Sequence, residues 1–405
     1  MNPFITTAVW APTGASLGWA NDFALAACLF SPITHLWGPI VSYNLLHLIG
    51  PPLSGWSAFV LCRYLAGRFW PAWMGGLVFA FSPYMLTGMA DEIFLLLVFP
   101  LPLAVRATLR RLKGDLAARD YVAILAVLLS VQFLVSQELF ATATLFGAIA
   151  FWLAARSSSP DEYTRLRSTA WLIGGAYVIS VLIISPYLYF MFAYERPTGF
   201  IFVPWGSSVD LLGLVVPTRL NQLGNLPLLQ AITHRFRANL YDCGGAYIGL
   251  PLLAIIVLFA REHWRDRSCR LMLWMFGAAC ILAMGPLLEI LGYRLLPLPG
   301  AALSALPLIS KALPGRLMLY AYLVLAVIVT MWLAEEDGRN TLRWALGLAI
   351  VPFMLPNLSA SYWATPAEIP AFFASGLYRQ NLSPGETVMV LPYGYLGEGM
   401  LWQAT

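Results

Sequence analysis

The sequence contains little charge. Only 11% of its 405 residues are Asp, Glu, Lys or Arg, whereas 60% are hydrophobic and the mean hydropathy is +0.72. A soluble globular chain carries about 25% charged residues, most of which cover its surface. The composition therefore predicts a polytopic membrane protein.

Sequence patterns typical of metal and nucleotide sites are also missing. The cysteines form no C-x-x-C pair and the histidines no H-x-x-x-H pair, so neither the usual zinc sites nor a disulfide framework is indicated. No G-x-x-x-x-G-K motif is found, which argues against a nucleotide site of the kind that drives a pump. The net charge of +4 is small and no basic segment is interleaved with aromatic residues, which argues against a nucleic-acid partner.

Long, continuous apolar runs are abundant. Lipid offers no hydrogen bonds, so a spanning segment must satisfy its own backbone, and continuous rather than alternating apolar runs favour helices over a barrel. We therefore expect an all-α, multi-pass protein. With about 20 residues per crossing, about ten helices are predicted, near 38–61, 69–86, 93–109, 120–136, 139–155, 169–193, 247–260, 271–291, 316–334 and 342–358.

Basic residues gather in alternate connections between these helices. Sixteen of the 24 Lys and Arg residues lie in five short connections, near 62–68, 106–119, 156–167, 261–270 and 339–343. By the positive-inside rule these connections are cytoplasmic. The connections at 87–92, 194–246 and 292–315, and the tail from 359, then lie outside, and the long outer loop 194–246 is expected to hold short interfacial helices.

The two ends of the chain are expected to belong to larger units. Residues 1–37 would form the remainder of a first outer loop. The sequence shows no signal peptide or apolar helix that would carry them across the membrane, so we expect a transmembrane helix upstream of Met1. The transmembrane domain is predicted to cover 1–358. Residues 359–405, with an apolar strand from Val388 to Leu391, predict the start of a truncated extracytoplasmic α/β domain.

One outer connection, MLTGMADEIFLLLVFP, places Asp91 and Glu92 between two apolar runs. A charge inside the bilayer is costly and usually functional, but at the boundary with water the cost falls toward zero. Two interpretations remain open from the residues alone: solvated loop carboxylates, or a functional pair at the outer surface.

Several segments resemble a known family, namely GPIVSYNLLHLI, FAFSPYM, FPLPLAV and YIGLPLL. They are similar to bacterial polytopic membrane glycosyltransferases of the C-type (GT-C) fold, a superfamily that includes protein mannosyltransferases, aminoarabinose transferases and oligosaccharyltransferases, and in particular to its YfhO-like branch. The resemblance covers most of the chain and specifies architecture better than reaction. It implies a bacterial cytoplasmic membrane location and transfer of a sugar from a polyprenyl-phosphate donor to an envelope acceptor.

In that superfamily the first outer loop contains an essential acidic residue, and some members have a second acidic motif in the next outer loop. The resemblance thus makes Asp91 and Glu92 expected catalytic residues. Asp22 is the only carboxylate in 1–37. It is therefore the remaining candidate for the first position, although it does not follow a first helix directly as the family's residue does.

Such a transfer needs a carboxylate to accept the acceptor's proton and a cation to offset charge on the departing phosphate. The cation is either a divalent metal such as Mg²⁺ or Mn²⁺, held by Asp91 and Glu92, or a basic side chain. Lys311 and Arg316, in ISKALPGRLMLY, are the basic candidates. Snorkelling to lipid head groups is the alternative interpretation of Arg316.

Two further carboxylates are candidates for binding substrate. Glu138, in SVQFLVSQELF, is either a helix-start carboxylate at the positive end of the helix dipole or a ligand in a cavity. Glu289, in GPLLEILGY, is expected near the outer end of a helix. The rival functions are a transporter or flippase of a lipid-linked glycan and a non-catalytic homologue that acts in envelope assembly.

Overall fold

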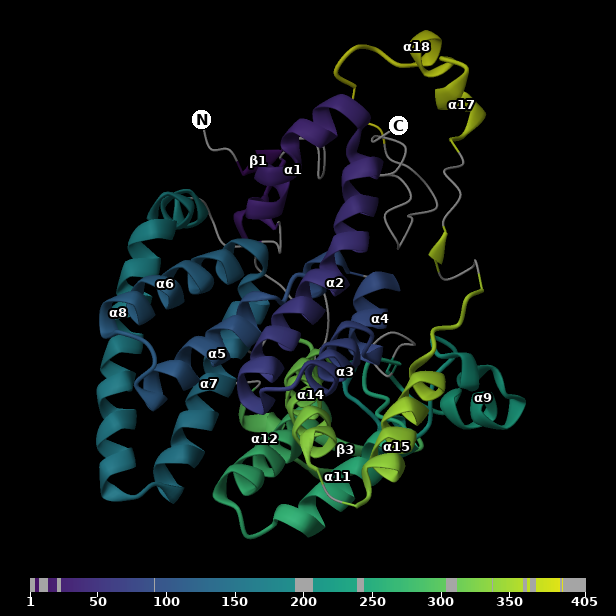
Figure 1. Ribbon diagram of the computed structural model, residues 1–405. Coiled ribbons are helices and arrows are strands. Elements are labelled where there is room, and N and C mark those ends of the chain that lie inside the picture. The colour runs from purple at the N-terminus through teal and green to yellow at the C-terminus, as the bar shows by residue number, and fades with distance from the viewer. Residues whose placement is uncertain are drawn as a thin grey trace.

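The computed structural model describes residues 4–6, 14–19, 23–90, 92–193, 207–238, 244–303, 312–336, 338–359, 363–364, 369–386 and 388. The described chain is mostly helical, with two short antiparallel hairpins (Figure 1). The predicted class, a helical membrane protein, is confirmed at this level.

Within the described residues, six helical segments are long and apolar enough to cross a membrane. They are α2 (Pro39–Ala66), η2 with α5 (Ile93–Lys113), α6 (Ala118–Val135), α7 (Gln137–Ser157), α8 (Pro160–Phe192) and η7 with α14 (Pro314–Ala334). Other helices are shorter, namely α1 (Ala24–Trp37), α3 (Phe69–Ala80), α11 (Leu250–His263), α12 (Arg267–Ala283) and α15 (Asn340–Met354). The structure thus indicates a multi-pass membrane protein, whereas the predicted number of about ten spanning helices is not confirmed.

Prolines, glycines and caps account for the boundaries that differ from expectation. The helix expected at 69–86 is interrupted before Pro83, where α4 (Pro83–Ala90) begins. Helix α8 begins at Pro160 rather than near 169, because Ser159 and Glu162 form a capping box. Helix α12 ends at Ala283 instead of 291, and the chain continues through Gly285, which has a positive φ, into a β-hairpin.

The segments expected as outer loops contain short elements. Residues 24–37 form helix α1, which packs against α2 and α6, instead of a loop. Strands β1 (Ile5–Thr6) and β2 (Ala15–Ser16) precede it with η1 (Leu17–Trp19). The long loop holds the expected short helices, η4 (Leu211–Leu214), η5 (Gln222–Asn225) and α9 (Pro227–Thr233).

The C-terminal third contains the second hairpin and several very short helices. Strands β3 (Leu287–Ile290) and β4 (Tyr293–Pro297) pair antiparallel. The short helices are α13 (Gly300–Leu303), α17 (Ala371–Ala374) and α18 (Tyr378–Asn381). Most of the strand expected from Val388 to Leu391 lies outside the described residues.

Helix α14 (Met318–Ala334) lies at the centre of the helix packing. It contacts α2, α3, α11, α12 and α15 (Figure 1), and most of its residues are buried. Its contact with α3 is close because a Cβ on Gly75 would come within 2.6 Å of the Ala326 carbonyl oxygen. Small residues allow such backbone approach, which is the main source of packing energy between helices in lipid.

The five basic connections lie at one end of the bundle. Contacts between their side chains join all five, namely Arg68–Glu336 at 2.6 Å, Tyr64–Asp115 at 2.8 Å, Arg267–Glu162 at 3.4 Å and Arg339–Glu262 at 2.8 Å. Helices that alternate in direction place every second connection on the same side. The arrangement therefore agrees with the alternation that the basic residues predicted.

The α3–α14 contact gives a stability prediction. Gly75→Ala should lower the midpoint of thermal unfolding of the detergent-purified protein, because overpacking of a close contact costs about 1–3 kcal/mol. Gly147→Ala in α7 is the matched control, since a Cβ there meets nothing within 4 Å. Equal midpoints for Gly75→Ala and the wild type would show that α14 can move away from α3 at no cost.

The orientation of the bundle can be tested by cysteine labelling in spheroplasts. We expect Leu228→Cys on α9 to react with a membrane-impermeant maleimide, and Ala117→Cys to react only after permeabilisation. Both positions are exposed. The background carries Cys28→Ser and Cys243→Ser, and the other three cysteines are buried. The reverse pattern would invert the topology and move the site described next to the cytoplasmic face.

Candidate functional site

Three charged side chains from separate connections meet at the end of the bundle opposite the basic connections. The guanidinium of Arg316 donates through Nη1 to Glu138 Oε2 at 2.5 Å and through Nη2 to Glu92 Oε2. The exposed fractions of the three side chains are only 11% for Arg316, 10% for Glu138 and 24% for Glu92. The sequence had singled out each residue separately, and the structure brings them together.

Helix capping fixes the position of Glu138. Ser136 caps α7 by accepting a hydrogen bond from the Leu139 N–H at 3.3 Å, which places Glu138 in the first turn. Its other oxygen, Oε1, accepts from the Leu313 N–H at 3.3 Å. Glu138 is therefore both a helix-start carboxylate and a partner of a distant basic residue, so the two interpretations are not exclusive.

The other two members lie where the chain enters short 3-10 turns. Arg316 belongs to η7 (Pro314–Leu317), in which Pro314 begins the turn that leads into α14. Glu92 immediately precedes η2 (Ile93–Leu95). All three residues thus lie at element ends on one side of the bundle, and backbone geometry rather than long flexible loops sets their spacing.

A ladder of side chains continues from this charged cluster into the bundle. Tyr320 lies on α14, one turn after Arg316 of η7, and Thr142 lies on α7, one turn after Glu138. The Tyr320 hydroxyl donates to Thr142 Oγ1 at 2.7 Å. The Tyr320 ring then stacks on Phe146, with centroids 4.0 Å apart. Sequence reasoning missed Tyr320 and Thr142, although their i+4 spacing from Arg316 and Glu138 was a usable signal.

Two more aromatic residues border the cluster. The Arg316 guanidinium lies 5.3 Å from the ring centroid of Phe94, a cation–π distance. The Tyr84 hydroxyl is buried, and the charges of Arg316, Glu138 and Glu92 act on it, but no hydrogen-bond partner is found for it among the described residues. A buried hydroxyl without a partner costs free energy, so it is a donor that an entering ligand can satisfy.

The charge balance of the cluster bears on a metal. Two carboxylates and one guanidinium give a formal charge of −1, and the guanidinium already bridges both carboxylates. A divalent cation between Glu92 and Glu138 would meet Arg316, so these two residues as arranged do not fit a metal site. Asp91, the other predicted metal ligand, lies outside the described residues, as do Asp22 and Lys311.

Glu289 belongs to a different part of the structure. It lies on β3 of the hairpin and not at a helix end, which corrects the expectation. The residue is buried, and its Oε1 accepts from Arg294 Nε on β4 at 2.9 Å. Asp210 supports the same hairpin by accepting the Gly292 N–H at 2.8 Å. Glu289 is therefore a partner of Arg294 within the hairpin.

A second charged network, at the end with the basic connections, was not anticipated. Glu262, His263 and Glu335 offer ligand atoms within 4.8 Å of one another. Arg343, with only 3% of its side chain exposed, contacts Glu262 at 3.1 Å and Glu335 at 2.7 Å, and Arg339 contacts Glu262 at 2.8 Å. These arginines already compensate the carboxylates, so the network joins α11, α14 and α15 structurally.

No family model, curated protein or solved structure matches the chain.

The buried position of Arg316 gives a stability prediction. Arg316→Gln leaves two carboxylates without their shared cation, and an uncompensated buried charge costs about 3–5 kcal/mol. We therefore expect a clearly lower midpoint of thermal unfolding in detergent. Adding Glu92→Gln and Glu138→Gln to the same chain should restore most of the loss, because no unpaired charge remains. A triple variant no more stable than Arg316→Gln would show that the cluster contributes through shape rather than charge.

Proposed function

We propose that the chain is a membrane glycosyltransferase of GT-C-like architecture. It transfers a sugar from a polyprenyl-phosphate-linked donor to an envelope acceptor at the outer face of a bacterial cytoplasmic membrane. The observation that carries the proposal is the pair of carboxylates, Glu92 and Glu138, held by one guanidinium, Arg316, at the ends of membrane-spanning segments. The family resemblance of the sequence supplies the reaction class.

The first step of the proposed mechanism is competition for Arg316. A guanidinium has five N–H donors in a planar fork and binds phosphate in a bidentate way. In the observed arrangement Nη1 and Nη2 each serve a carboxylate. A donor phosphate that binds one edge of the guanidinium displaces one carboxylate. In the absence of the donor, the two carboxylates occupy the positions at which the phosphate would bind.

The displaced carboxylate then serves as the general base. It accepts the proton of the acceptor hydroxyl as the acceptor oxygen forms its bond to the anomeric carbon of the sugar. The bond between that carbon and the phosphate oxygen breaks, and the electron pair leaves with the polyprenyl phosphate. Arg316 offsets the charge on this leaving group.

The position of the cluster favours an enzyme over a transporter. Transporter sites lie near the bilayer midplane, commonly where helices are broken. Glu138 lies in the first turn of α7, and Arg316 and Glu92 lie in or beside turns that begin spans. A site at the ends of the helices lies at the boundary between the membrane, which holds a lipid-linked donor, and water, which holds the acceptor.

The two roles predict opposite effects on binding and turnover. Arg316→Lys should weaken binding of undecaprenyl phosphate to the purified protein about tenfold, because an ammonium lacks the fork. Glu92→Gln and Glu138→Gln should retain or tighten this binding, since each removes a competing anion. Of these two carboxylate variants, the one that removes the general base should lower the rate of sugar transfer about a hundredfold or more.

Transfer is measured in membrane vesicles with a panel of labelled polyprenyl-phosphate hexoses and pentoses. The matched control is Glu336→Gln, an exposed carboxylate that pairs with Arg68 at the opposite end of the bundle. It should change neither quantity. Unchanged undecaprenyl phosphate binding in Arg316→Ala would remove this residue from the site. Transport of the lipid-linked sugar across the vesicle membrane without transfer would favour the flippase.

A further inference from the structure

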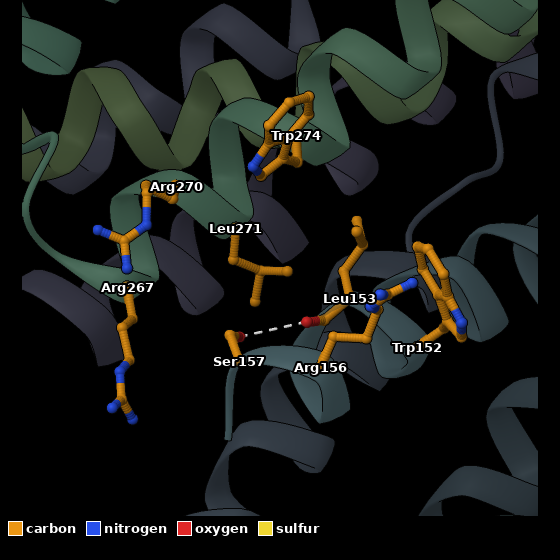
Figure 2. Close-up of a pocket in the computed structure, with 8 residues that line it drawn as sticks. All are labelled: Trp152, Leu153, Arg156, Ser157, Arg267, Arg270, Leu271 and Trp274. Atoms are coloured by element: carbon orange, nitrogen blue, oxygen red, sulfur yellow. Dashed lines mark hydrogen bonds between the residues drawn. The ribbon is translucent and has the colours of Figure 1, made fainter. Parts of the chain in front are cut away.

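A pocket of about 390 Å³ lies between the last turns of α7 and the first turns of α12, far along both helices from the charged cluster (Figure 2). Helix α7 contributes Trp152, Leu153, Arg156 and Ser157, and α12 contributes Arg267, Arg270, Leu271 and Trp274. Figure 2 shows the two sets facing each other across the opening. This is the end of the bundle that carries the basic connections.

The pocket has an excess of positive charge. Its lining contains three arginines and no carboxylate. Among the described residues, one carboxylate pairs with them: Glu162 contacts Arg267 at 3.4 Å, and both side chains are more than half exposed. An exposed pair of this kind contributes little and is readily exchanged. The lining therefore suits an anion.

Two of the three arginines have contacts that hold their side chains in place. Arg270 donates through Nη1 to the carbonyl oxygens of Trp264 at 3.1 Å and Arg265 at 3.0 Å. The Arg156 guanidinium lies 5.0 Å from the Trp152 ring centroid, a cation–π distance. Contacts that fix the donors before binding reduce the entropy that a ligand must overcome.

The remaining lining residues place the pocket at the membrane boundary. The indoles of Trp152 and Trp274 are exposed, at 57% and 62%, and tryptophan concentrates where acyl chains meet head groups. Leu153 and Leu271 supply apolar surface beside the arginines. Figure 2 shows Arg267 and Arg270 on one side of the opening and Arg156 beside Trp152 on the other. A pocket that combines guanidiniums with exposed indoles matches a molecule with a phosphate head and apolar chains.

We infer that this pocket binds an anionic phospholipid of the inner leaflet, with the lipid head group in the opening that Arg156, Arg267 and Arg270 line and the acyl chains along Trp152 and Trp274. Basic pockets between helices on the cytoplasmic side select anionic head groups by charge. The site is independent of the glycosyltransferase proposal, because it shares no residue with the cluster around Arg316.

The test is a titration of the full chain, purified in a non-ionic detergent, with phosphatidylglycerol and native mass spectrometry as the readout. Phosphatidylcholine with the same acyl chains and inorganic phosphate are separate arms. We expect phosphatidylglycerol to bind at least tenfold more tightly than phosphatidylcholine, and inorganic phosphate not to displace it at millimolar concentration. Tighter binding of the anionic lipid follows from the uncompensated guanidiniums.

The variants are Arg156→Gln and the double variant Arg156→Gln/Arg267→Gln. Each lost guanidinium should weaken phosphatidylglycerol binding about fivefold, so the double variant loses about 25-fold. Arg119→Gln, an exposed arginine of another basic connection, is the matched control and should bind as the wild type does. Arg156→Gln removes only a ring contact from the described structure, so it is informative even if the double variant folds poorly.

Three results would overturn the inference. Equal affinity of the wild type for phosphatidylglycerol and phosphatidylcholine would show that the pocket does not recognise the charge of the head group. Unchanged phosphatidylglycerol binding in Arg156→Gln would place the lipid elsewhere. Complete displacement of phosphatidylglycerol by inorganic phosphate would show that the pocket recognises phosphate alone and makes no use of the acyl chains.

Discussion

The packing of α14 is the constraint on which both ends of the structure depend. In lipid, apolar side chains gain little by exchanging acyl chains for one another, because both surroundings are apolar. Helices therefore associate through close packing and polar contacts. Helix α14 has both: its backbone approaches Gly75 of α3, and Thr330 Oγ1 donates to Ala326 O at 2.7 Å and Pro71 O at 3.2 Å. Arg316 lies just before this helix, and at its other end the Trp332 carbonyl accepts from Arg343. A displaced α14 would therefore disturb both charged networks together.

The contacts between α14 and α7 make the geometry at the outer end discrete. Arg316 pairs with Glu138, and one turn further on Tyr320 pairs with Thr142. A rotation of either helix breaks both pairs, and a slide by one turn brings Tyr320 beside Glu138 and leaves Arg316 without this partner. The position of Glu138 relative to Arg316 is consequently set by helix packing. Precise spacing of this kind is what a pair of groups with separate roles in proton acceptance and charge compensation requires.

Much of this architecture follows from the sequence, and the exceptions have physical causes. Apolar runs of sufficient length marked the helices, and alternation of basic connections put Glu92, Glu138 and Arg316 on one side. Contact between them could not be predicted, because it depends on which helices are neighbours. The residues LLEIL, at 287–291, were misassigned as the end of a helix, since short leucine-rich runs suit helix and strand alike. The turn at Gly292, with φ of 77°, closes this segment into a hairpin that buries Glu289 beside Arg294. Helix α1 was missed because Pro32 lies inside it.

The two arginine sites differ in the cost of leaving them empty, and this difference sets what each can select. Arg316 is 11% exposed, and a buried cation is costly to leave unpaired, so the proposed donor would have to replace Glu92 or Glu138 there. Such a site discriminates strongly, because a poor ligand leaves a carboxylate and a guanidinium both desolvated and unpaired. Arg267, with 59% of its side chain exposed, is solvated whether or not a ligand is present. An unoccupied Arg267 therefore carries no desolvation penalty. Binding of the proposed lipid at that end would follow the concentration of anionic lipid in the membrane, whereas binding of the proposed donor at Arg316 would follow the fit of a single molecule.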